Sequence, residues 1–370
     1  MKKIKYIYEF KNWPEFSWHQ KKIAEKLAIV RHRQGRWIGQ MESLGFAPRA
    51  EAFLQSLTEE TVKTSEIEGE KLDRSQVRSS IARRLGMEDG GLIRTNRNVE
   101  GIVEIMVDAT QNYNAHLTRE RLFGWHSLLF PTGRSGMNKI RVGKWRDDKN
   151  GPMQIISGPV GRNKVHFEAP AAELLNTEMK RFLVWFNAKK GYDEVLKAGI
   201  AHLWFVTLHP FEDGNGRIAR MIADMALARS EKTPQRFYSM SAQISLERKV
   251  YYNILESTQK GSLDIREWLE WFLDCLSRAF RSAESTLDSV FKKTRFWEIH
   301  REDEFNARQK KVLNRLLEGF EGKLTSSKWA ALAKCSQDTA NRDIGDLLER
   351  KFLSRNPGGG RSTSYSLRVG

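Results

Sequence analysis

Apolar side chains recur at three- to four-residue intervals along most of this chain, a spacing that is typical of amphipathic helices. Trp18, Ile23, Val30 and Trp37, for example, fall on one side of a predicted helix over residues 17–45. We therefore expect a mainly α fold. Further helices are predicted over residues 50–68, 75–85, 95–114, 118–129, 171–189, 193–208, 216–229, 244–258 and 264–282.

Residues 139–168 interrupt this helical spacing. Pro152–Ile156 and Val165–Phe167 are short apolar runs on either side of a segment rich in glycine and proline, Gly158–Gly161. Two such runs around a turn predict a β-hairpin.

The C-terminal part of the chain has the order of elements that is typical of a winged helix-turn-helix. Helices are predicted over residues 308–319, 326–334 and 337–350. Cys335–Ser336 would be the turn before the last helix, and two short strands around Gly358–Gly360 would form the wing.

These elements divide the 370 residues into four expected parts. An N-terminal helical module covers residues 1–90, and a helical core that contains the hairpin covers residues 91–285. A charged linker over residues 286–306 then leads to the winged helix over residues 307–370.

Composition narrows the choice of partners. The chain has 62 Lys and Arg against 46 Asp and Glu, a net charge of +16, which suits anionic partners as well as simple solubility. The two cysteines, Cys275 and Cys335, match no metal or redox spacing. No apolar run is long enough for a signal peptide or a membrane span, so we expect a cytoplasmic protein without membrane contact.

The segment 209–220, His-Pro-Phe-Glu-Asp-Gly-Asn-Gly-Arg-Ile-Ala-Arg, concentrates the chemistry of the chain. His209 is a proton acceptor near neutral pH. Asp213 offers the carboxylate oxygen that Mg²⁺ prefers. An apolar helix precedes the segment and another helix begins within it, so an anion would lie at a helix N-terminus.

The second half of the segment suits a phosphate ligand. Gly214 and Gly216 allow the backbone to approach an anion closely, and Asn215 adds a side-chain donor. Arg217 and Arg220 are three residues apart, so they share one helix face and both reach phosphate oxygens.

This segment resembles the signature of the Fic domain family, His-Pro-Phe-x-Asp/Glu-Gly-Asn-Gly-Arg-x-x-Arg, at every specified position. The resemblance implies a protein adenylyltransferase that uses ATP and Mg²⁺ and moves AMP to a hydroxyl of a Ser, Thr or Tyr in a protein substrate. By the motif match, His209 would deprotonate that hydroxyl. Asp213 would hold Mg²⁺ between the α- and β-phosphates.

The same match implies contacts for the rest of the nucleotide. Asn215 and the backbone of Gly214–Gly216 would stabilise charge on the α-phosphate, Arg217 would hold the β-phosphate and Arg220 the γ-phosphate. The hairpin near residues 153–167 corresponds to the family's flap, which pairs with the target segment. Three residues, Tyr251, Tyr252 and Asn253, lie where relatives contact the base, although core packing suits one of the tyrosines.

A second pattern lies about 140 residues earlier. Thr64-Ser65-Glu66-Ile67-Glu68-Gly69 resembles the family's inhibitory pattern, Ser/Thr-x-x-x-Glu-Gly/Asn, on a helix expected over about 56–69. Gly69 suits a helix C-cap, which puts Glu68 in the last turn, where the helix dipole disfavours a carboxylate by roughly 0.3–1 kcal/mol. By resemblance, Arg220 is the cation that offsets this cost, with Thr64 on the same face.

The pattern gives no role to the neighbouring acids Glu66 and Glu70. The resemblance also raises the hypothesis that Glu68 supports removal of AMP from the target, as in some relatives. Many relatives dimerise, so the resemblance leaves a homodimer open.

The winged helix would contact either DNA or another protein. Its region, residues 301–370, has 14 Lys and Arg against 9 Asp and Glu. Residues that could reach base edges from the last helix are Gln337, Thr339, Asn341 and Arg342. Residues that could meet phosphates are Lys351, Arg355 and Arg361.

The sequence therefore predicts an autoinhibited protein adenylyltransferase. Two other interpretations stay open: a winged-helix regulator that uses the core only to sense ATP, and an enzyme that transfers a different phosphate-containing group. The intact His209 favours an enzyme, because sensing needs the arginines but not a base.

Overall fold

The computed structural model describes residues 6–87, 93–157, 164–189, 191–317, 320, 322–357 and 363–368. It separates into two compact units, residues 1–283 and 284–370, which are described individually.

The first unit is helical, as predicted. Its α-helices are α1 (Gln20–Glu42), α2 (Phe46–Ile67), α3 (Arg74–Arg84), α4 (Arg97–Gln111), α5 (Arg119–Leu129), α6 (Leu175–Asn187), α7 (Glu194–Leu208), α8 (Asn215–Glu231), α9 (Met240–Leu246), α10 (Arg248–Gln259) and the first part of α11 (Arg266–Ile299). Two 3₁₀ turns, Ile7–Glu9 and Ala172–Leu174, precede α1 and α6. No helix among the described residues is both long and apolar enough to span a membrane.

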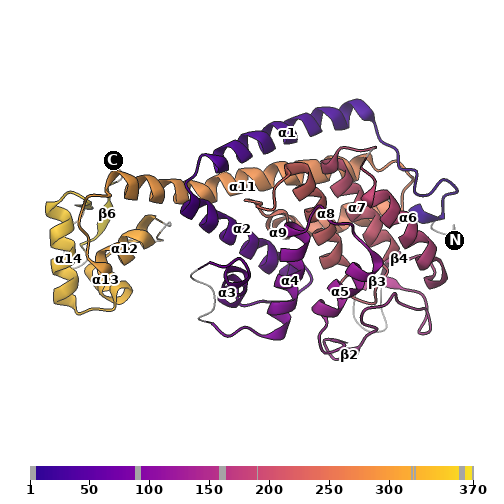
Figure 1. Ribbon diagram of the computed structural model, residues 1–370, viewed down its shortest axis with the longest axis horizontal. Coiled ribbons are helices and arrows are strands. Elements are labelled where there is room, and N and C mark those ends of the chain that lie inside the picture. The colour runs from indigo at the N-terminus through magenta and orange to yellow at the C-terminus, as the bar shows by residue number, and fades with distance from the viewer. Residues whose placement is uncertain are drawn as a thin grey trace. The chain divides into compact units, whose positions relative to one another are not determined.

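Helices α7 and α8 form the centre of this unit (Figure 1). Every residue of α7 from Val195 to Leu208 is buried, and so are most residues of α8. A helix that is apolar on all sides is stable only when other helices surround it. Here α6 packs on α7, while α2, α4 and α5 pack on α8, so the loop between the two central helices is held on a rigid base.

Polar contacts join α1 to α11, which run side by side in Figure 1. Lys26 Nζ lies 2.7 Å from an oxygen of Asp274, and Arg33 Nη1 donates to Ser277 Oγ over 2.6 Å. The charged face of α1 thus attaches the N-terminal segment to the end of the core.

Two helices differ from their predicted extents. One helix was predicted over residues 244–258, but α9 and α10 are separated at Glu247, whose backbone (φ −106°, ψ 20°) leaves the helical region. Both carboxylate oxygens of Glu247 accept hydrogen bonds from Arg278, each over 2.6 Å. This tertiary contact accompanies the break, and no sequence spacing indicates it.

Helix α11 is longer than predicted. It continues to Ile299 through most of residues 286–306, for which the charges predicted a linker. Exposed charges are compatible with a helix, because only one face needs apolar residues. Phe280 is buried in the first unit, whereas Phe296 belongs to the core of the second.

The predicted hairpin is present as β3 (Gln154–Ser157) and β4 (Lys164–Glu168), paired antiparallel with a register shift between Ile155 and Ile156. The intervening Gly158–Gly161 segment lies outside the described residues. The sequence did not predict a second small hairpin, β1 (Arg134–Ser135) with β2 (Asn138–Lys139).

The second unit contains α12 (Ala307–Leu317), α13 (Ser326–Ala333), α14 (Gln337–Glu349) and an antiparallel pair, β5 (Leu353–Arg355) and β6 (Tyr365–Leu367). Ser336 caps α14 by accepting a hydrogen bond from the Thr339 amide. Trp329, Val312 and Leu347 lie in its core. This is the element order expected of a winged helix; Gly358–Gly360 and Arg361 lie outside the described residues.

Candidate functional site

The geometry of the segment 209–220 starts from two unusual backbone positions. His209 ends α7 with φ 47° and ψ 57°, a left-handed conformation, and Pro210 follows it directly. Proline disfavours a helical conformation in the residue before it, so α7 stops there. Gly214 (φ 81°) then begins α8, and a Cβ at this position would meet Phe130 at 2.9 Å. The loop therefore needs glycine at residue 214.

Phe211 is the anchor of this loop. It is fully buried and stacks on His126, with ring centroids 4.1 Å apart and planes 8° from parallel. The carboxamide of Asn215 bonds both backbone groups of Phe211: Phe211 N donates to Oδ1 over 3.0 Å, and Nδ2 donates to the Phe211 carbonyl over 2.8 Å. In this structure Asn215 closes the loop, and its expected contact with phosphate stays a prediction.

His209 is held in its neutral form. Its Nδ1 lies 3.3 Å from the Val206 carbonyl, so the proton sits on Nδ1 and the lone pair on Nε2. Burial lowers the pKa of His209 to about 4, helped by the charge of Arg146 and opposed by the Val206 bond and the charge of Glu68. Arg146 also donates from Nε to the His209 carbonyl over 2.8 Å, which fixes the backbone.

Asp213 presents a carboxylate beside this base. One oxygen accepts from the Gly214 amide over 2.6 Å, and the other accepts from the Ser135 hydroxyl. No group of three or more His, Cys, Asp or Glu in the described part of the chain is arranged to hold a metal. A single carboxylate still fits Mg²⁺, which is usually bound by one or two protein carboxylates together with substrate phosphates.

Arg220 is buried at 2% exposure and contacts the end of α2. Its Nε donates to Thr64 Oγ1 over 2.7 Å, and its Nη2 donates to the Thr64 carbonyl over 2.8 Å and to Glu68 Oε1 over 2.7 Å. Burial lowers the pKa of Arg220, but the charge and hydrogen bond of Glu68 together with Tyr251 and Tyr252 outweigh burial, so the net shift is upward. The structure thus brings together Thr64, Glu68 and Arg220.

The Glu68 carboxylate occupies the N-terminus of α8. A Cβ on Gly216, in the first turn of that helix, would lie 2.2 Å from Glu68 Oε1. Glycine at residue 216 therefore lets an anion approach the backbone, as the sequence predicted, and in this structure the anion is a side chain of the protein.

Arg217 has a partner that sequence reasoning missed. Its Nη1 lies 2.6 Å from Glu70 Oε2, and its guanidinium lies 5.1 Å from the centre of the Phe130 ring. Glu70 falls outside the inhibitory pattern, and only the fold brings it to α8. The one sequence feature that could have indicated this contact is Gly69, because a glycine in the left-handed conformation turns the chain sharply after α2.

The three residues expected near the base of the nucleotide differ in exposure. Tyr251 is buried, and its hydroxyl lies 2.9 Å from His202 Nε2, so it is a core residue here. Tyr252 is 40% exposed and its hydroxyl donates to the Ile67 carbonyl over 3.4 Å. Asn253 is exposed on α10. Only Tyr252 and Asn253 are therefore accessible in this conformation.

The hairpin stands next to α10. In β4, His166 Nδ1 lies 2.6 Å from Glu256 Oε2, and Phe167 packs in the core against Tyr6. All residues of β3 are exposed, and β3 pairs only with β4 within the described residues. Its other edge offers backbone groups to an added strand.

His126 also supports the loop, and the sequence analysis did not identify it. Its Nε2 lies 3.2 Å from the Asp213 carbonyl, and its Nδ1 accepts from the Gly143 amide over 3.1 Å. Burial lowers its pKa to about 4, against the hydrogen bond and charge of Asp213. His126 is thus neutral at physiological pH and holds the loop.

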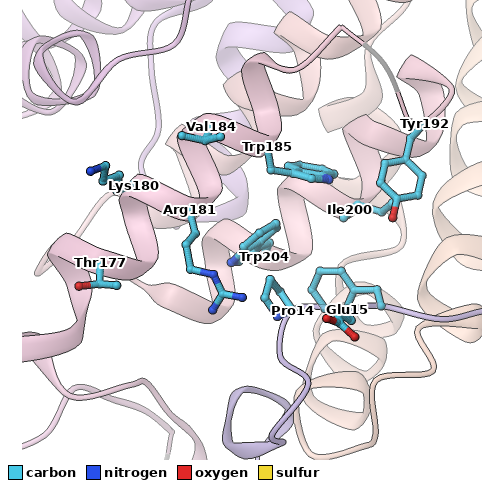
Figure 2. Close-up of a pocket in the computed structure, with 11 residues that line it drawn as sticks. Pro14, Glu15, Thr177, Lys180, Arg181, Val184, Trp185, Tyr192, Ile200 and Trp204 are labelled. Atoms are coloured by element: carbon cyan, nitrogen blue, oxygen red, sulfur yellow. The ribbon is translucent and has the colours of Figure 1, made fainter.

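A separate cavity of about 530 Å³ lies between α6, α7 and the segment before α1. Figure 2 shows its aromatic side chains, Trp185, Trp204 and Tyr192, with Arg181 toward the other end. None of residues 209–220 lines it. The candidate site is therefore the N-terminal end of α8 with its two nearly buried arginines, not this cavity.

Comparisons with known proteins find matches to the region that contains this segment. Residues 116–227 match the model of the Fic/DOC family, and residues 6–87 match a domain of unknown function, DUF4172. The chain is 27% identical over 217 residues to the Protein adenylyltransferase Fic of Aedes aegypti, and 31% identical over 139 residues to that of Drosophila virilis. These alignments cover 57% and 36% of the chain, but only 38% and 26% of those relatives.

Solved structures share the fold. A Fic family protein from Desulfovibrio desulfuricans aligns with a TM-score of 0.54 and 18% identity, over 94% of this chain and 95% of the other. A Fic domain containing signaling protein from Bacteroides thetaiotaomicron aligns with a TM-score of 0.51 and 19% identity, over 69% of this chain and 95% of the other. Residues 116–227 therefore form a domain that matches the Fic/DOC family.

Proposed function

We propose that this protein is an autoinhibited protein adenylyltransferase that moves AMP from ATP to a hydroxyl side chain of a protein. One observation carries the proposal. Beside a neutral histidine, a carboxylate already lies on a buried arginine at the N-terminus of α8, where a nucleotide phosphate would bind. Relatives that bear the name Protein adenylyltransferase Fic match over the same region.

The proposed reaction follows from the geometry of His209. Its Nε2 lone pair accepts the proton of the target hydroxyl as the hydroxyl oxygen forms a bond to the α-phosphorus. The bond from the α-phosphorus to the bridging oxygen breaks, and pyrophosphate leaves with that electron pair. Amides at the start of α8 stabilise the extra charge on the α-phosphate.

Asp213 is proposed to hold Mg²⁺ together with phosphate oxygens of ATP. When bound, the ion would neutralise charge on the phosphates. Arg217 and Arg220 would hold the β- and γ-phosphates. The exposed β3 edge would align the protein substrate by strand addition.

In the conformation described, Glu68 keeps the γ-phosphate from Arg220, so ATP cannot bind with its phosphates extended along α8. Glu68 is thus proposed as the inhibitory residue, with Thr64 holding the arginine in place and Gly69 closing the helix.

The first prediction concerns Glu68 and His209. With Mg²⁺ and α-labelled ATP, Glu68→Gly is expected to increase protein-bound label on the order of tenfold or more, because Arg220 is then open to phosphate; each factor of ten corresponds to about 1.4 kcal/mol. His209→Ala in the Glu68→Gly background is expected to lower it by about 100-fold or more, because the base is lost.

A parallel reaction with γ-labelled ATP serves as the control. Label from γ-ATP would assign transfer of a different phosphate group instead. ATP binding without transfer in every variant would favour the sensor function over the enzyme.

The second prediction concerns the protonation of His209. Because burial depresses its pKa to about 4, the ring stays neutral at neutral pH and becomes protonated only as the pH falls toward about 4. Nitrogen NMR of histidine-labelled protein, assigned with His209→Ala, is expected to show an Nδ1–H tautomer and this low midpoint. A midpoint near about 6.5, the unperturbed value, or an Nε2–H tautomer would contradict the assigned base.

The C-terminal unit supports a second, separate proposal of DNA contact. Asn341 and Arg342 are exposed on α14, and Lys334 is exposed just before it. Asp343, in the middle of α14, is buried and paired with Arg308, so it adds no exposed acid beside Arg342. The alternative is protein contact through the same surface.

The third prediction tests this choice by fluorescence anisotropy on a mixed-sequence DNA duplex. If α14 contacts DNA, Arg342→Ala is expected to weaken binding by about tenfold, within the range of about 1–3 kcal/mol for one such contact. Glu349→Gln, at the other end of α14, is the matched control. Binding that is equal in both variants, or no binding at low salt, would contradict DNA contact by α14.

A further inference from the structure

The contact between Glu70 and Arg217 is not explained by inhibition through Glu68 alone. Glu70 Oε2 lies 2.6 Å from Arg217 Nη1. The arginine side chain is 7% exposed and the glutamate side chain 35% exposed. The partly exposed carboxylate of Glu70 therefore pairs with the nearly buried guanidinium of Arg217.

The backbone at the end of α2 explains how Glu70 gets there. Gly69 has φ 86°, its amide donates to the Glu66 carbonyl over 2.9 Å, and the Glu70 amide donates to the Ser65 carbonyl over 3.0 Å. This pair of bonds is the Schellman motif, with Glu68 as the C-cap and Glu70 two residues later. The left-handed conformation of Gly69 therefore sets the positions of the two flanking acids, Glu68 and Glu70.

These two carboxylates meet two different arginines. Glu68 lies 2.7 Å from Arg220, and Glu70 lies 2.6 Å from Arg217. Both guanidinium groups are nearly buried, and a buried cation without an anion is strongly unfavourable. The turn after α2 thus provides the same number of negative charges as the arginines require.

We propose that Glu70 is a second inhibitory carboxylate, which competes with a nucleotide phosphate for Arg217. This inference rests on the proposed function, because it takes the arginines as phosphate ligands. Each acid then opposes a different phosphate: Glu70 opposes the β-phosphate at Arg217, and Glu68 opposes the γ-phosphate at Arg220. Substitution of Glu68 alone leaves the contact between Glu70 and Arg217 in place.

The two acids are therefore distinguishable by the nucleotide that their removal favours. ADP has a β-phosphate but no γ-phosphate, so it competes with Glu70 and not with Glu68. ATP competes with both. AMP competes with neither and reports on the rest of the site.

The experiment is isothermal titration of the full chain with ADP, ATP and AMP in the presence of Mg²⁺. The variants are Glu70→Gln, which keeps the shape of the side chain, Glu70→Ser as a second way to remove the charge, and Glu68→Gln. Glu66→Gln is the matched control, because Glu66 lies on the same turn but pairs with Lys63 over 2.7 Å. Thermal unfolding midpoints check that each variant is folded.

Glu70→Gln and Glu70→Ser are expected to tighten both ADP and ATP binding by about fivefold to tenfold, consistent with an ion pair that has one buried partner. Glu68→Gln is expected to tighten ATP binding but leave ADP binding unchanged, and Glu66→Gln to change neither. In the Glu68→Gly background, Glu70→Gln is expected to increase AMP transfer by a similar factor.

Unchanged or weaker ADP binding in both Glu70 variants, while Glu68→Gln tightens ATP, would overturn the inference and make Glu70 a residue that only orders Arg217. Absence of nucleotide binding in every variant, including Glu68→Gln, would instead overturn the proposed function and this inference with it.

Discussion

The ion pair between Arg220 and Glu68 is the interaction on which the site depends. Arg220 is almost fully buried, and a buried charge that loses its partner costs about 3–5 kcal/mol. The arginine therefore needs an anion at all times, either a carboxylate of the protein or a phosphate of a ligand. Under the proposed function, the same position would therefore serve both inhibition by Glu68 and binding of a nucleotide phosphate.

The rest of the fold supplies a rigid frame for that exchange. The loop between α7 and α8 is fixed by Phe211 in the core, by Asn215 across its base and by Arg146 on the His209 carbonyl. In contrast, the acids are carried by the exposed end of α2 and the turn at Gly69. In the proposed mechanism, movement of this turn would release the arginines without disturbing the loop that carries His209.

The sequence was informative wherever function is encoded in local spacing. The helical fold, the hairpin, the loop of residues 209–220 and the facing positions of Thr64 and Glu68 were all predictable from short-range patterns. Glu70, Arg146 and His126 were not, because each reaches the loop from a distant segment through tertiary packing. Likewise, the break at Glu247 accompanies a contact with Arg278, and residue spacing alone did not show that Asn215 bonds Phe211.

The most direct test of this account is a crystal structure of Glu68→Gly with ATP and Mg²⁺. The account predicts that the terminal phosphate contacts the Arg220 guanidinium where Glu68 Oε1 now lies, with the α-phosphate near Nε2 of His209. An ATP molecule bound away from α8, for example in the aromatic cavity beside Trp204, with Arg220 not in contact with phosphate, would contradict it.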